Sequence, residues 1–407
     1  MTRAPAERPA LRPLDARRVH TPAAGFLLHD PFGISAPAFV PLALLPIVRR
    51  LDGCRSVGQI RAEAAAEFAG ELPLSLVQDV VRQLDELTLL QGPCFDRAVA
   101  AAAAAFVAAG ERPPSHAGSA GYPDDPTALR AALQRMVRAP VGPVARLCGL
   151  VAPHLDLARG HAGYRAAYER LAAAPLAELY VLFGTGHAGP RAPVTGLPLD
   201  WRTPLGTVRT DRDYVDAVHA ELGAASPTDL LLHRDEHSLE LQVLLLQHVH
   251  DLRRAPPPLV AGFLCGALPS QHGDPLREAY GRRLVAAFRR AAPGRRVCFL
   301  AGADLAHIGP VFGDAAPIDD ARLATLRTAE ASHLQHLVAG QPGAFHRVIA
   351  GCGNPDRVCS APAITLCAAL AGGPAELLHY GQARAADDSQ TVSFCALAFA
   401  GSPAAGE

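Results

Sequence analysis

The sequence contains no lysine, so all 38 of its basic residues are arginines. This absence excludes catalysis through a lysine Schiff base and nucleotide binding through the lysine of a P-loop. No apolar run reaches the ~20 residues that a transmembrane helix needs. Residues 1–18 are polar, with prolines and arginines, and lack the apolar centre of a secretory signal. We therefore expect a cytoplasmic protein without a membrane partner.

An excess of charge of either sign is also absent. The formal net charge is −1, and the chain has 19% charged and 49% hydrophobic residues. This composition is typical of a globular protein and gives no electrostatic basis for binding nucleic acid. With 407 residues, the chain is long enough for one large core and a smaller domain.

The sequence lacks a pattern of paired cysteines. Its nine cysteines are an odd number, and no two of them form a CxxC motif. An HExxH motif is absent too, so we do not expect a structural zinc site. We expect free thiols, most of them inside apolar runs where cysteine acts as a small buried hydrophobe. These are Cys148, Cys265, Cys298, Cys367 and Cys395.

The N-terminal part is predicted to hold a tail, a small domain and a linker. Residues 1–20 are expected to be a disordered tail and residues 21–95 a small, mainly helical domain. Residues 96–126 combine an alanine-rich helix with a linker rich in Pro, Gly, Ser and Asp. Apolar spacing and a serine cap predict three helices in the small domain. They cover residues 38–51, 57–68 and 76–87.

This small domain resembles two known kinds of domain. Three helices with a short strand-like end resemble a winged helix, and the LDGCRSVGQI stretch resembles PqqD-like peptide-binding domains found beside peptide-modifying enzymes. The resemblance implies a peptide or protein partner bound through residues 26–93, and a packing or regulatory role is the alternative. DNA binding is disfavoured because Arg55, Arg61 and Arg82 are spread out and balanced by acids.

From residue 127 to residue 402, predicted strands and helices alternate, which indicates an α/β domain with helices on both faces of a sheet. The strands are expected at residues 147–152, 178–183, 258–264, 296–300, 377–380 and 392–399. The helices are expected at residues 163–173, 211–222, 239–249, 275–292, 320–339, 342–350 and 362–370. Residues 194–209 are rich in Thr, Val and turn residues and predict a hairpin.

Three of these strands end in a turn that carries a histidine. His154 follows the first strand, His187 follows the second in a Gly-Thr-Gly-His turn, and His307 follows the fourth, three residues after Asp304. An α/β sheet places its chemistry at the carboxyl ends of its strands. Asp304 could fix the tautomer of His307, which could then move a proton. The alternative is that each histidine only bonds nearby backbone groups.

An acidic run lies before the predicted helix at residues 239–249. An ordinary helix cap explains Asp235 and Ser238 in this run, but it explains His237, next to Glu236, less well. We therefore keep Glu236 and His237 as candidate acid or base residues.

A cysteine, Cys359, lies just before the predicted helix at residues 362–370. The positive end of that helix would favour the thiolate form. Cys352, in a glycine-rich loop nearby, competes for the same role.

Histidines from three strand ends, together with a cysteine at a helix start, indicate one metal site. Two neutral imidazoles, one anionic ligand and open positions are typical of Fe(II). A thiolate in place of a carboxylate would soften the site and admit Zn or Cu as well. We therefore predict a divalent metal cofactor, with Fe(II) first and Cu or Zn as alternatives.

Residues from about 116 to 400 resemble the Memo family, the AmmeMemoRadiSam system protein B group, which is similar in fold to the class III extradiol dioxygenases. The matching stretches are HAGSAGYPDDPTAL, VAPHLDLARG, LFGTGH, TPLGTVRTD, DEHSLELQ, ADLAHIG and VCSAPAI. The resemblance implies a mixed sheet flanked by helices. It also implies metal ligands and acidic or proton-handling partners. The ligands fall on His154, His187 and Cys359, and the partners on Asp304, His307, Glu236 and His237.

The sequence departs from the family pattern around this site. Residues 301–303 are Ala, Gly and Ala where a serine pair is usual, and Ser360 stands where glycine is usual. His161, in an HAGY stretch, competes with His154 as a ligand. These departures keep the ligand set but change the surroundings in which protons would move.

The resemblance implies a metal-dependent oxygenase or oxidase that acts on a small-molecule or peptide substrate. The alternative is a non-catalytic metal-binding or partner-binding scaffold in a modification pathway. Zinc-dependent hydrolysis also fits three ligands and an open position, but the sequence has no clear glutamate base on a metal-binding helix.

Overall fold

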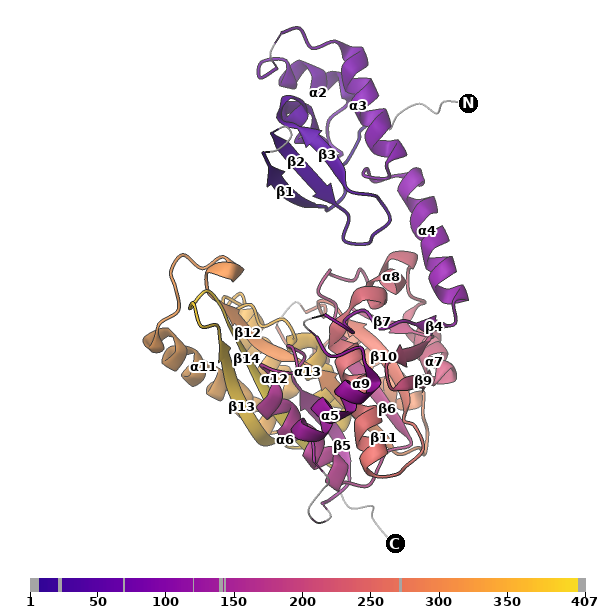
Figure 1. Ribbon diagram of the computed structural model, residues 1–407, viewed down its shortest axis with the longest axis vertical. Coiled ribbons are helices and arrows are strands. Elements are labelled where there is room, and N and C mark those ends of the chain that lie inside the picture. The colour runs from indigo at the N-terminus through magenta and orange to yellow at the C-terminus, as the bar shows by residue number, and fades with distance from the viewer. Residues whose placement is uncertain are drawn as a thin grey trace. The chain divides into compact units, whose positions relative to one another are not determined.

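The computed structural model describes residues 7–20, 24–68, 70–119, 121–138, 142, 144–270 and 273–401. The chain divides into two compact units, residues 1–108 and residues 109–407. Figure 1 shows the first unit in indigo and purple and the second in magenta to yellow. Among the helices of the described ranges, none combines the length and apolar character needed to cross a bilayer.

The N-terminal unit combines helices with a three-stranded antiparallel sheet in the order β1–β2–β3. Its elements are β1 Asp15–Val19, β2 Gly25–His29, β3 Ala38–Pro41, η1 Leu42–Leu44, α1 Leu45–Val48, α2 Val57–Ala64, α3 Leu74–Glu86 and α4 Pro93–Ala108. Ser56 and Gln59 cap α2 reciprocally, each side chain accepting from the other's backbone N–H. Leu28, Ile47 and Val81 belong to one buried apolar cluster, so this unit has its own core.

The expected disordered tail is wrong for residues 7–20, which have defined structure. The Leu11 N–H donates to the Leu51 carbonyl at 2.7 Å, and β1 pairs with β2 along its whole length. Four of the five residues of β1 are exposed, so its polar sequence gives no sign of a strand. Residues 15–19 form a strand because they pair with β2, and their own sequence does not favour one. Residues 1–6 of the predicted tail lie outside the described residues.

The predicted helix at residues 38–51 is also wrong at its start. Residues 38–41 form β3, and helix follows only at η1 and α1. Pro41 favours an extended Val40, because a proline ring clashes with a helical residue before it. The unit therefore contains a sheet that the sequence analysis did not predict, and its likeness to a winged helix stays a prediction.

The expected boundary at residue 127 differs from the structural one at residue 109. Helix α4 belongs to the first unit, whereas β4, Glu111–Arg112, pairs with β8 at the edge of the large sheet. Arg112 is fully buried and bonds Glu240, which lies 128 positions further along the chain. The composition of residues 109–126 is that of a linker, and it gives no sign of a partner so far along the chain. For this reason the sequence placed the domain boundary too late.

The second unit alternates strands and helices. Its strands are β4 Glu111–Arg112, β5 Leu147–Ala152, β6 Leu179–Thr185, β7 Val194–Leu197, β8 Asp200–Thr203, β9 Gly206–Thr210, β10 Leu259–Cys265, β11 Val297–Gly302, β12 Asp304–Ile308, β13 Glu376–Arg384 and β14 Thr391–Ala400. Its helices are α5 Pro126–Met136, α6 His161–Ala173, α7 Arg212–Leu222, α8 Pro227–Asp235, α9 His237–Leu252, η2 Pro275–Arg277, α10 Ala279–Arg290, η3 Pro310–Phe312, α11 Asp320–Val338, α12 Pro342–Gly351 and α13 Ala361–Ala371.

These strands form one large mixed sheet, which confirms the predicted fold class. Neighbouring strands follow the order β12–β14–β5–β11–β6–β10–β9–β8–β4, while β13 also pairs with β14 and β7 with β10. The central strands β5, β11, β6, β10 and β9 are parallel. Their carboxyl ends therefore meet at one edge of the sheet, where α/β folds place their sites.

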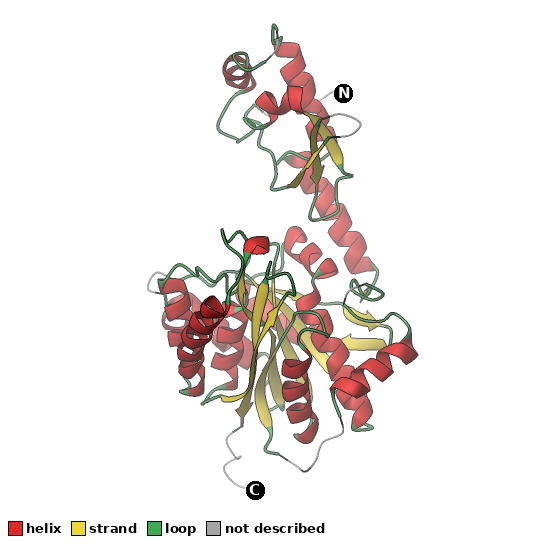
Figure 2. Cartoon of the chain, turned by 60° about the vertical axis from the view of Figure 1, so that its left-hand side comes forward, coloured by secondary structure: helices red, strands yellow, loops and turns green. Residues whose placement is uncertain are grey.

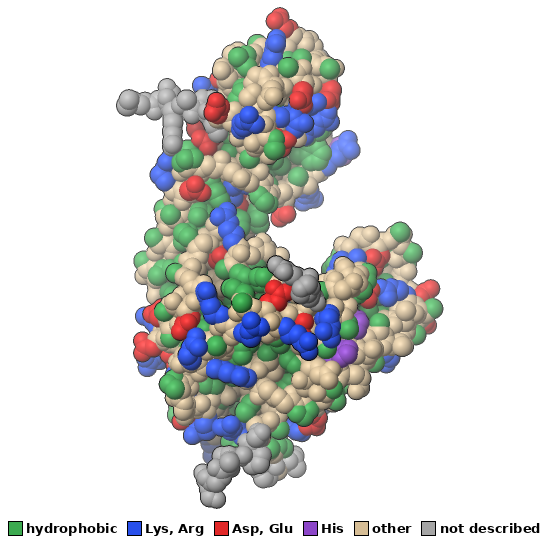
Figure 3. All heavy atoms as spheres, turned by 180° about the vertical axis from the view of Figure 1, so that it is seen from behind, with side chains coloured by type: hydrophobic (Ala, Val, Ile, Leu, Met, Phe, Trp, Pro, Cys, Tyr) green, Lys and Arg blue, Asp and Glu red, His purple; other side chains and the backbone are tan. Residues whose placement is uncertain are grey.

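Helices cover both faces of the sheet, as Figure 2 shows. Two successive residues of β10 face opposite helices: Gly262 faces Leu239 of α9, whereas the Phe263 ring lies 4.8 Å from the Phe288 ring of α10. Helices α5, α6 and α9 contact one another on the first face, and α10 contacts α7 and α13 on the second. The outer surface seen in Figure 3 carries both arginine and acidic side chains.

Candidate metal centre

His154 stands at the end of β5, where Pro153 closes the strand. Its side chain is buried, and its Nδ1 lies 3.0 Å from the Gly302 carbonyl of the neighbouring strand β11. A carbonyl only accepts, so Nδ1 donates its proton there, and Nε2 is the nitrogen on the side of Cys359. One nitrogen of His154 is therefore bonded to the backbone, as the alternative interpretation expected. The other nitrogen, Nε2, is the one that could bind a metal.

His187 follows β6 after Gly186 and is held by Glu236. Its Nδ1 lies 2.9 Å from a Glu236 oxygen, and its backbone N–H donates to the same carboxylate at 3.2 Å. Glu236 also caps α9, because it accepts from the Ser238 N–H at 3.0 Å. With Nδ1 bonded to the carboxylate, Nε2 of His187 is left for a proton or a metal ion.

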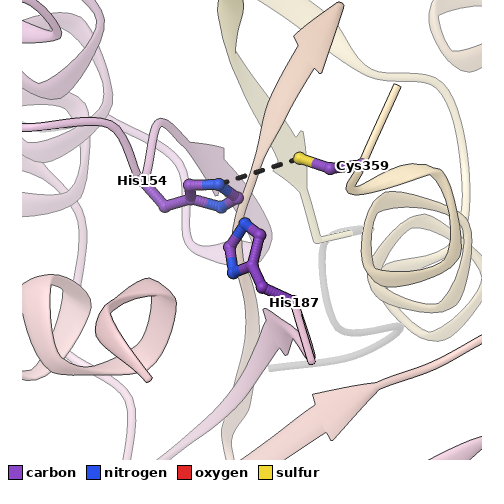
Figure 4. Close-up of side chains that lie close together, drawn as sticks. All are labelled: His154, His187 and Cys359. Carbon is purple, nitrogen blue, oxygen red and sulfur yellow. Dashed lines mark hydrogen bonds between the residues drawn. The ribbon is translucent and has the colours of Figure 1, made fainter. Parts of the chain in front are cut away.

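Cys359 reaches the same place from the turn before α13. Its Sγ lies 3.8 Å from His154 Nε2, and Figure 4 shows both histidines and the cysteine side by side. Burial raises the pKa of this thiol, but His154 and His187 outweigh burial and lower the pKa to about 7. The donor atoms of His154, His187 and Cys359 all lie within 4.8 Å of one another. The structure thus brings together the three residues that the family resemblance implied as ligands.

His187 carries a positive charge when no metal is bound. Burial lowers the pKa of its imidazole, but hydrogen bonds to Cys359 and Glu236 raise it to about 10. Burial raises the pKa of Glu236, yet its bonds to His187 hold that pKa well below the usual range. The thiolate of Cys359 and the carboxylate of Glu236 thus favour a protonated His187 between them. A metal cation would replace the proton on Nε2, because the same two negative charges would attract it.

His237, the first residue of α9, packs against both histidines. Its ring stacks on His187 at a centroid distance of 5.0 Å and meets His154 edge-on at 5.2 Å. Burial and the neighbouring His154 lower the pKa of His237 to about 3, so this imidazole is neutral at pH 7. His187, Glu236 and His237 form a second group whose donor atoms lie within 4.8 Å of one another. Because the two groups share His187, we treat them as one centre.

Asp304 and His307 lie on β12 at the same edge of the sheet. Asp304 accepts from the His154 N–H at 3.0 Å, and its second oxygen lies 3.4 Å from His154 Nε2. Burial raises the pKa of Asp304 to about 6. His307 bonds the Leu305 carbonyl through Nδ1 and packs against Phe312. Both residues are described, and they share no hydrogen bond, so the structure joins Asp304 to His154 where the sequence suggested His307.

Ser360 is a site residue to which sequence reasoning gave no role. It is fully buried, and its hydroxyl lies 2.7 Å from Thr185 Oγ1 on β6 and 3.2 Å from Cys359 Sγ. It also accepts from the Asp304 N–H at 3.1 Å. One buried hydroxyl thus ties the turn of Cys359 to two strands, and the departure from glycine at this position was the signal for it.

The two rival ligands lie elsewhere. His161 is the exposed first residue of α6, and Cys352 is exposed with its Sγ bonded to the Ile349 carbonyl. Within the ranges that the structure describes, neither residue belongs to a ligand group. The geometry therefore favours His154 over His161 and Cys359 over Cys352.

A cavity of about 490 Å³ opens beside Cys359. Its wall is mostly apolar and includes Gly186 after β6, Leu268, Ile349 of α12 and Val358. Its lining in the described residues carries no arginine and no carboxylate. A mostly apolar hollow next to a few polar groups is the usual form of a small-molecule site.

The α/β unit matches known proteins along its length. The family model described as Memo-like protein matches residues 112–398. A MEMO1 family protein from Aquifex aeolicus is 27% identical over 291 residues, which cover 71% of this chain and 73% of that protein. One from Thermus thermophilus is 29% identical over 248 residues, 61% of this chain and 70% of that protein. One from Archaeoglobus fulgidus is 34% identical over 154 residues, 37% of this chain and 54% of that protein.

A crystal structure of an uncharacterised protein from Escherichia coli K12 aligns with 62% of this chain and all of that chain. Its TM-score of 0.34 and identity of 13% are too low to carry an argument. The family match, by contrast, includes every site residue from His154 to Cys359 and nearly all of the second unit. The chain therefore belongs to the Memo-like protein family.

Proposed function

We propose that this protein is a metal-dependent oxygenase or oxidase, with non-haem Fe(II) as its metal and a small molecule or peptide as its substrate. The observation that carries the proposal is the meeting of two imidazoles and one thiol, from His154, His187 and Cys359, at the carboxyl edge of the sheet. Three protein ligands of this kind leave positions open for a substrate and for O₂.

The residues present fit a metal ion. The second nitrogen of each histidine is bonded, that of His154 to Gly302 and that of His187 to Glu236, which is how ligand histidines are held in orientation. The lowered pKa of Cys359 provides thiolate at neutral pH. His154 Nε2 and Cys359 Sγ lie 3.8 Å apart, close enough for both residues to hold one ion.

The bound metal would supply open coordination positions and, as Fe(II), electrons for O₂. Around it, Glu236 keeps the imidazole of His187 in place. His237 is neutral and offers a hydrogen-bond acceptor beside both histidines. Asp304 and His307 are the further acid and base candidates, with Asp304 in contact with His154.

The metal content of protein purified without oxygen tests this proposal. We expect about one iron per chain in the wild type, and loss of most of it in His187→Ala and in Cys359→Ala, because each variant removes one of three protein ligands. The matched controls are His161→Ala and Cys352→Ala, since both side chains are exposed and outside the ligand groups. Mass spectrometry of the metals measures iron, copper and zinc together.

Three outcomes of that measurement are informative. Iron in the wild type and in both controls, but not in the two ligand variants, supports the proposal and justifies O₂-uptake assays with catechol-like and peptide substrates. Copper or zinc in the same pattern keeps the site but replaces Fe(II), because a thiolate suits both metals. If metal is absent from the wild type even after all three are added, the proposal is wrong.

A scaffold for a peptide partner is the second candidate function, and one feature of the N-terminal unit favours it. Strand β3 lies at an edge of the small sheet; Phe39 within it is 42% exposed, and Leu42 just after it is 38% exposed. An exposed sheet edge can accept an extended peptide as an added strand, with apolar side chains giving specificity. This surface lies within residues 26–93, where the resemblance to peptide-binding domains falls.

Affinity capture with matched variants tests the scaffold. We expect Phe39→Asp to lose a captured peptide partner, because the substitution places a charge at the exposed edge. Val107→Asp is the control, since Val107 is a similarly exposed apolar residue on α4, at 38%. A partner that both variants retain, or both lose, contradicts a docking edge at β3.

A further inference from the structure

The cavity beside Cys359 has one titratable side chain other than a thiol in its described lining, that of His346. This histidine lies on α12 and is only 8% exposed. Within the described ranges it belongs to neither ligand group of the metal centre. The metal centre therefore gives His346 no role, although it lines the same cavity as Cys359.

Contacts between α12 and the segment before η2 restrain the ring of His346. Its Nδ1 lies 3.0 Å from the Gly273 carbonyl, and a carbonyl only accepts, so Nδ1 donates its proton there. One turn earlier, Gly343 packs so closely that an added Cβ would lie 2.2 Å from Asp274 Oδ1. Helix and segment are thus packed together, and the bond at Nδ1 leaves the other ring nitrogen to the cavity side.

That other nitrogen, Nε2, has no hydrogen-bond partner in the described residues. Nor is it one of the enclosed polar atoms left without a partner, as His333 Nδ1 is, so it reaches open space. Burial lowers the pKa of His346, although the bond to Gly273 and the charge of Asp274 act in the opposite direction. The imidazole is therefore neutral at pH 7, and Nε2 is a hydrogen-bond acceptor at the cavity wall.

The other polar side chains of the described wall are already engaged. The Thr185 hydroxyl lies 2.7 Å from the Ser360 hydroxyl. Asn354 accepts from the Val358 N–H at 2.8 Å and donates to the Val358 carbonyl at 3.1 Å. The remaining described residues of the wall are apolar, glycine or cysteine. Among the side-chain nitrogen and oxygen atoms of this wall, Nε2 of His346 is thus the free acceptor.

We propose that His346 determines the specificity of this site, because its Nε2 accepts a hydrogen bond from an O–H or N–H group on the apolar part of the substrate. The inference rests on the proposed function, since the cavity lies beside the ligand Cys359. The substrate would reach the metal with one end. Its mostly apolar body would lie in the cavity, against Leu268, Ile349 and Val358.

This arrangement narrows the substrate class to neutral, mostly apolar groups that carry one hydrogen-bond donor. A carboxylate or phosphate would find no arginine in the described lining, and an ammonium group would find no carboxylate, so burying either is unfavourable. A group that only accepts, such as an ether, would leave Nε2 of His346 without a donor, which weakens binding.

Two fluorinated probes test the assignment. 4-Fluorobenzyl alcohol donates one O–H, whereas its methyl ether has no donor. Fluorine NMR measures their dissociation constants with the full-length protein as purified. The variants are His346→Leu, which removes the acceptor, and His346→Gln, whose side-chain carbonyl can still accept. His379→Leu is the control, because His379 is a partly buried histidine of β13 outside the cavity lining. Metal content and thermal unfolding are measured for each protein.

We expect the wild type to bind the alcohol about tenfold more tightly than the ether, which is the scale of one hydrogen bond in a buried site. The ratio should fall towards one in His346→Leu, recover in part in His346→Gln and stay unchanged in His379→Leu. Nitrogen NMR gives a direct signature. The Nε2 resonance of His346, assigned by its loss in His346→Gln, should shift with the alcohol but not with the ether, and a merely structural role would not move it.

Several results would overturn the assignment. These are equal binding of the two probes by the wild type, binding of neither probe, or a ratio that His346→Leu leaves unchanged. If His346→Leu does not fold, the ring resonance of the wild type and the ratio in His346→Gln decide. The metal measurement is separate. A protein without metal that keeps the tenfold ratio loses the proposed function but keeps His346 as a binding residue. A metal-loaded protein with equal binding loses this inference alone.

Discussion

Glu240 and Arg112 form an ion pair in which both side chains are buried, at 1% and 0% exposure. Burying two charges costs much of what their attraction returns, so such a pair adds little net stability by itself. Breaking it is different, because the charge that remains is buried without a partner. Glu240 also holds Ser115 and Tyr122, so this one residue fixes the start of the second unit.

We expect Glu240→Gln to lower the free energy of unfolding by about 3–5 kcal/mol, because the charge of Arg112 stays buried and unpaired. Denaturant titration of the second unit measures the loss. The control, Glu221→Gln, removes the surface partner of Arg290 and should cost less than about 1 kcal/mol. If both variants lose the same free energy of unfolding, the buried ion pair contributes no more to stability than the surface pair, and the prediction is wrong.

The same variant should change the response to acid. Burial raises the pKa of Glu240, but a hydrogen bond with His116, the positive charge of Arg112 and a hydrogen bond with Tyr122 hold that pKa well below the usual range. Its folded-state pKa is therefore below its unfolded value of about 4.3, so its contribution is complete above that pH and is lost as the pH falls through the folded value. The stability gap between wild type and Glu240→Gln should therefore stay constant at neutral pH, begin to narrow as the pH falls below about 5, and go on narrowing towards the folded-state pKa.

At the scale of elements, the central strands could be predicted because a parallel strand covered on both faces has an almost continuous apolar sequence. Each of the six predicted strands of the α/β unit is present, as β5, β6, β10, β11, β13 and β14. Strand β12 was missed because its residues, Asp304–Ile308, include polar ones and become a strand by pairing with β14. Helix α8 was missed although Ser226 caps it and Pro227 begins it.

The residue types of the site could be predicted, but their partners could not. Histidines after apolar strands mark the carboxyl edge of a sheet, and this pattern is local. The partners come from segments far apart in the sequence. Examples are the contacts of His154 with the Gly302 carbonyl, of Thr185 with Ser360, and of the His116 N–H with Glu240. Single-sequence reasoning has no access to such contacts, and for this reason it paired Asp304 with His307.

The whole molecule has two cores, one in each unit. Leu28, Ile47 and Val81 belong to the apolar cluster of the first unit, and Val181 and Phe263 belong to the cluster of the second. A unit that buries its own apolar surface can fold without its neighbour. The ligand residues all lie in the second unit.

We therefore expect a fragment of residues 109–407 to fold and to bind as much metal per chain as the full protein. A shorter fragment, residues 127–407, begins at the boundary that the sequence suggested. It lacks Arg112 and Tyr122, so it leaves Glu240 buried without these partners and should unfold at a lower denaturant concentration. Metal analysis and denaturant titration of both fragments make the comparison, and equal midpoints would contradict the structural boundary at residue 109.

His154, His187 and Cys359 come from segments that are far apart along the chain. An ion held by all three would bind the folded chain far better than the unfolded one. It would therefore shift the folding equilibrium towards the folded state by mass action. The amount of intact protein in a cell would then follow the supply of that ion. Selection could preserve the three side chains for this reason alone, even in a relative that has lost its chemistry.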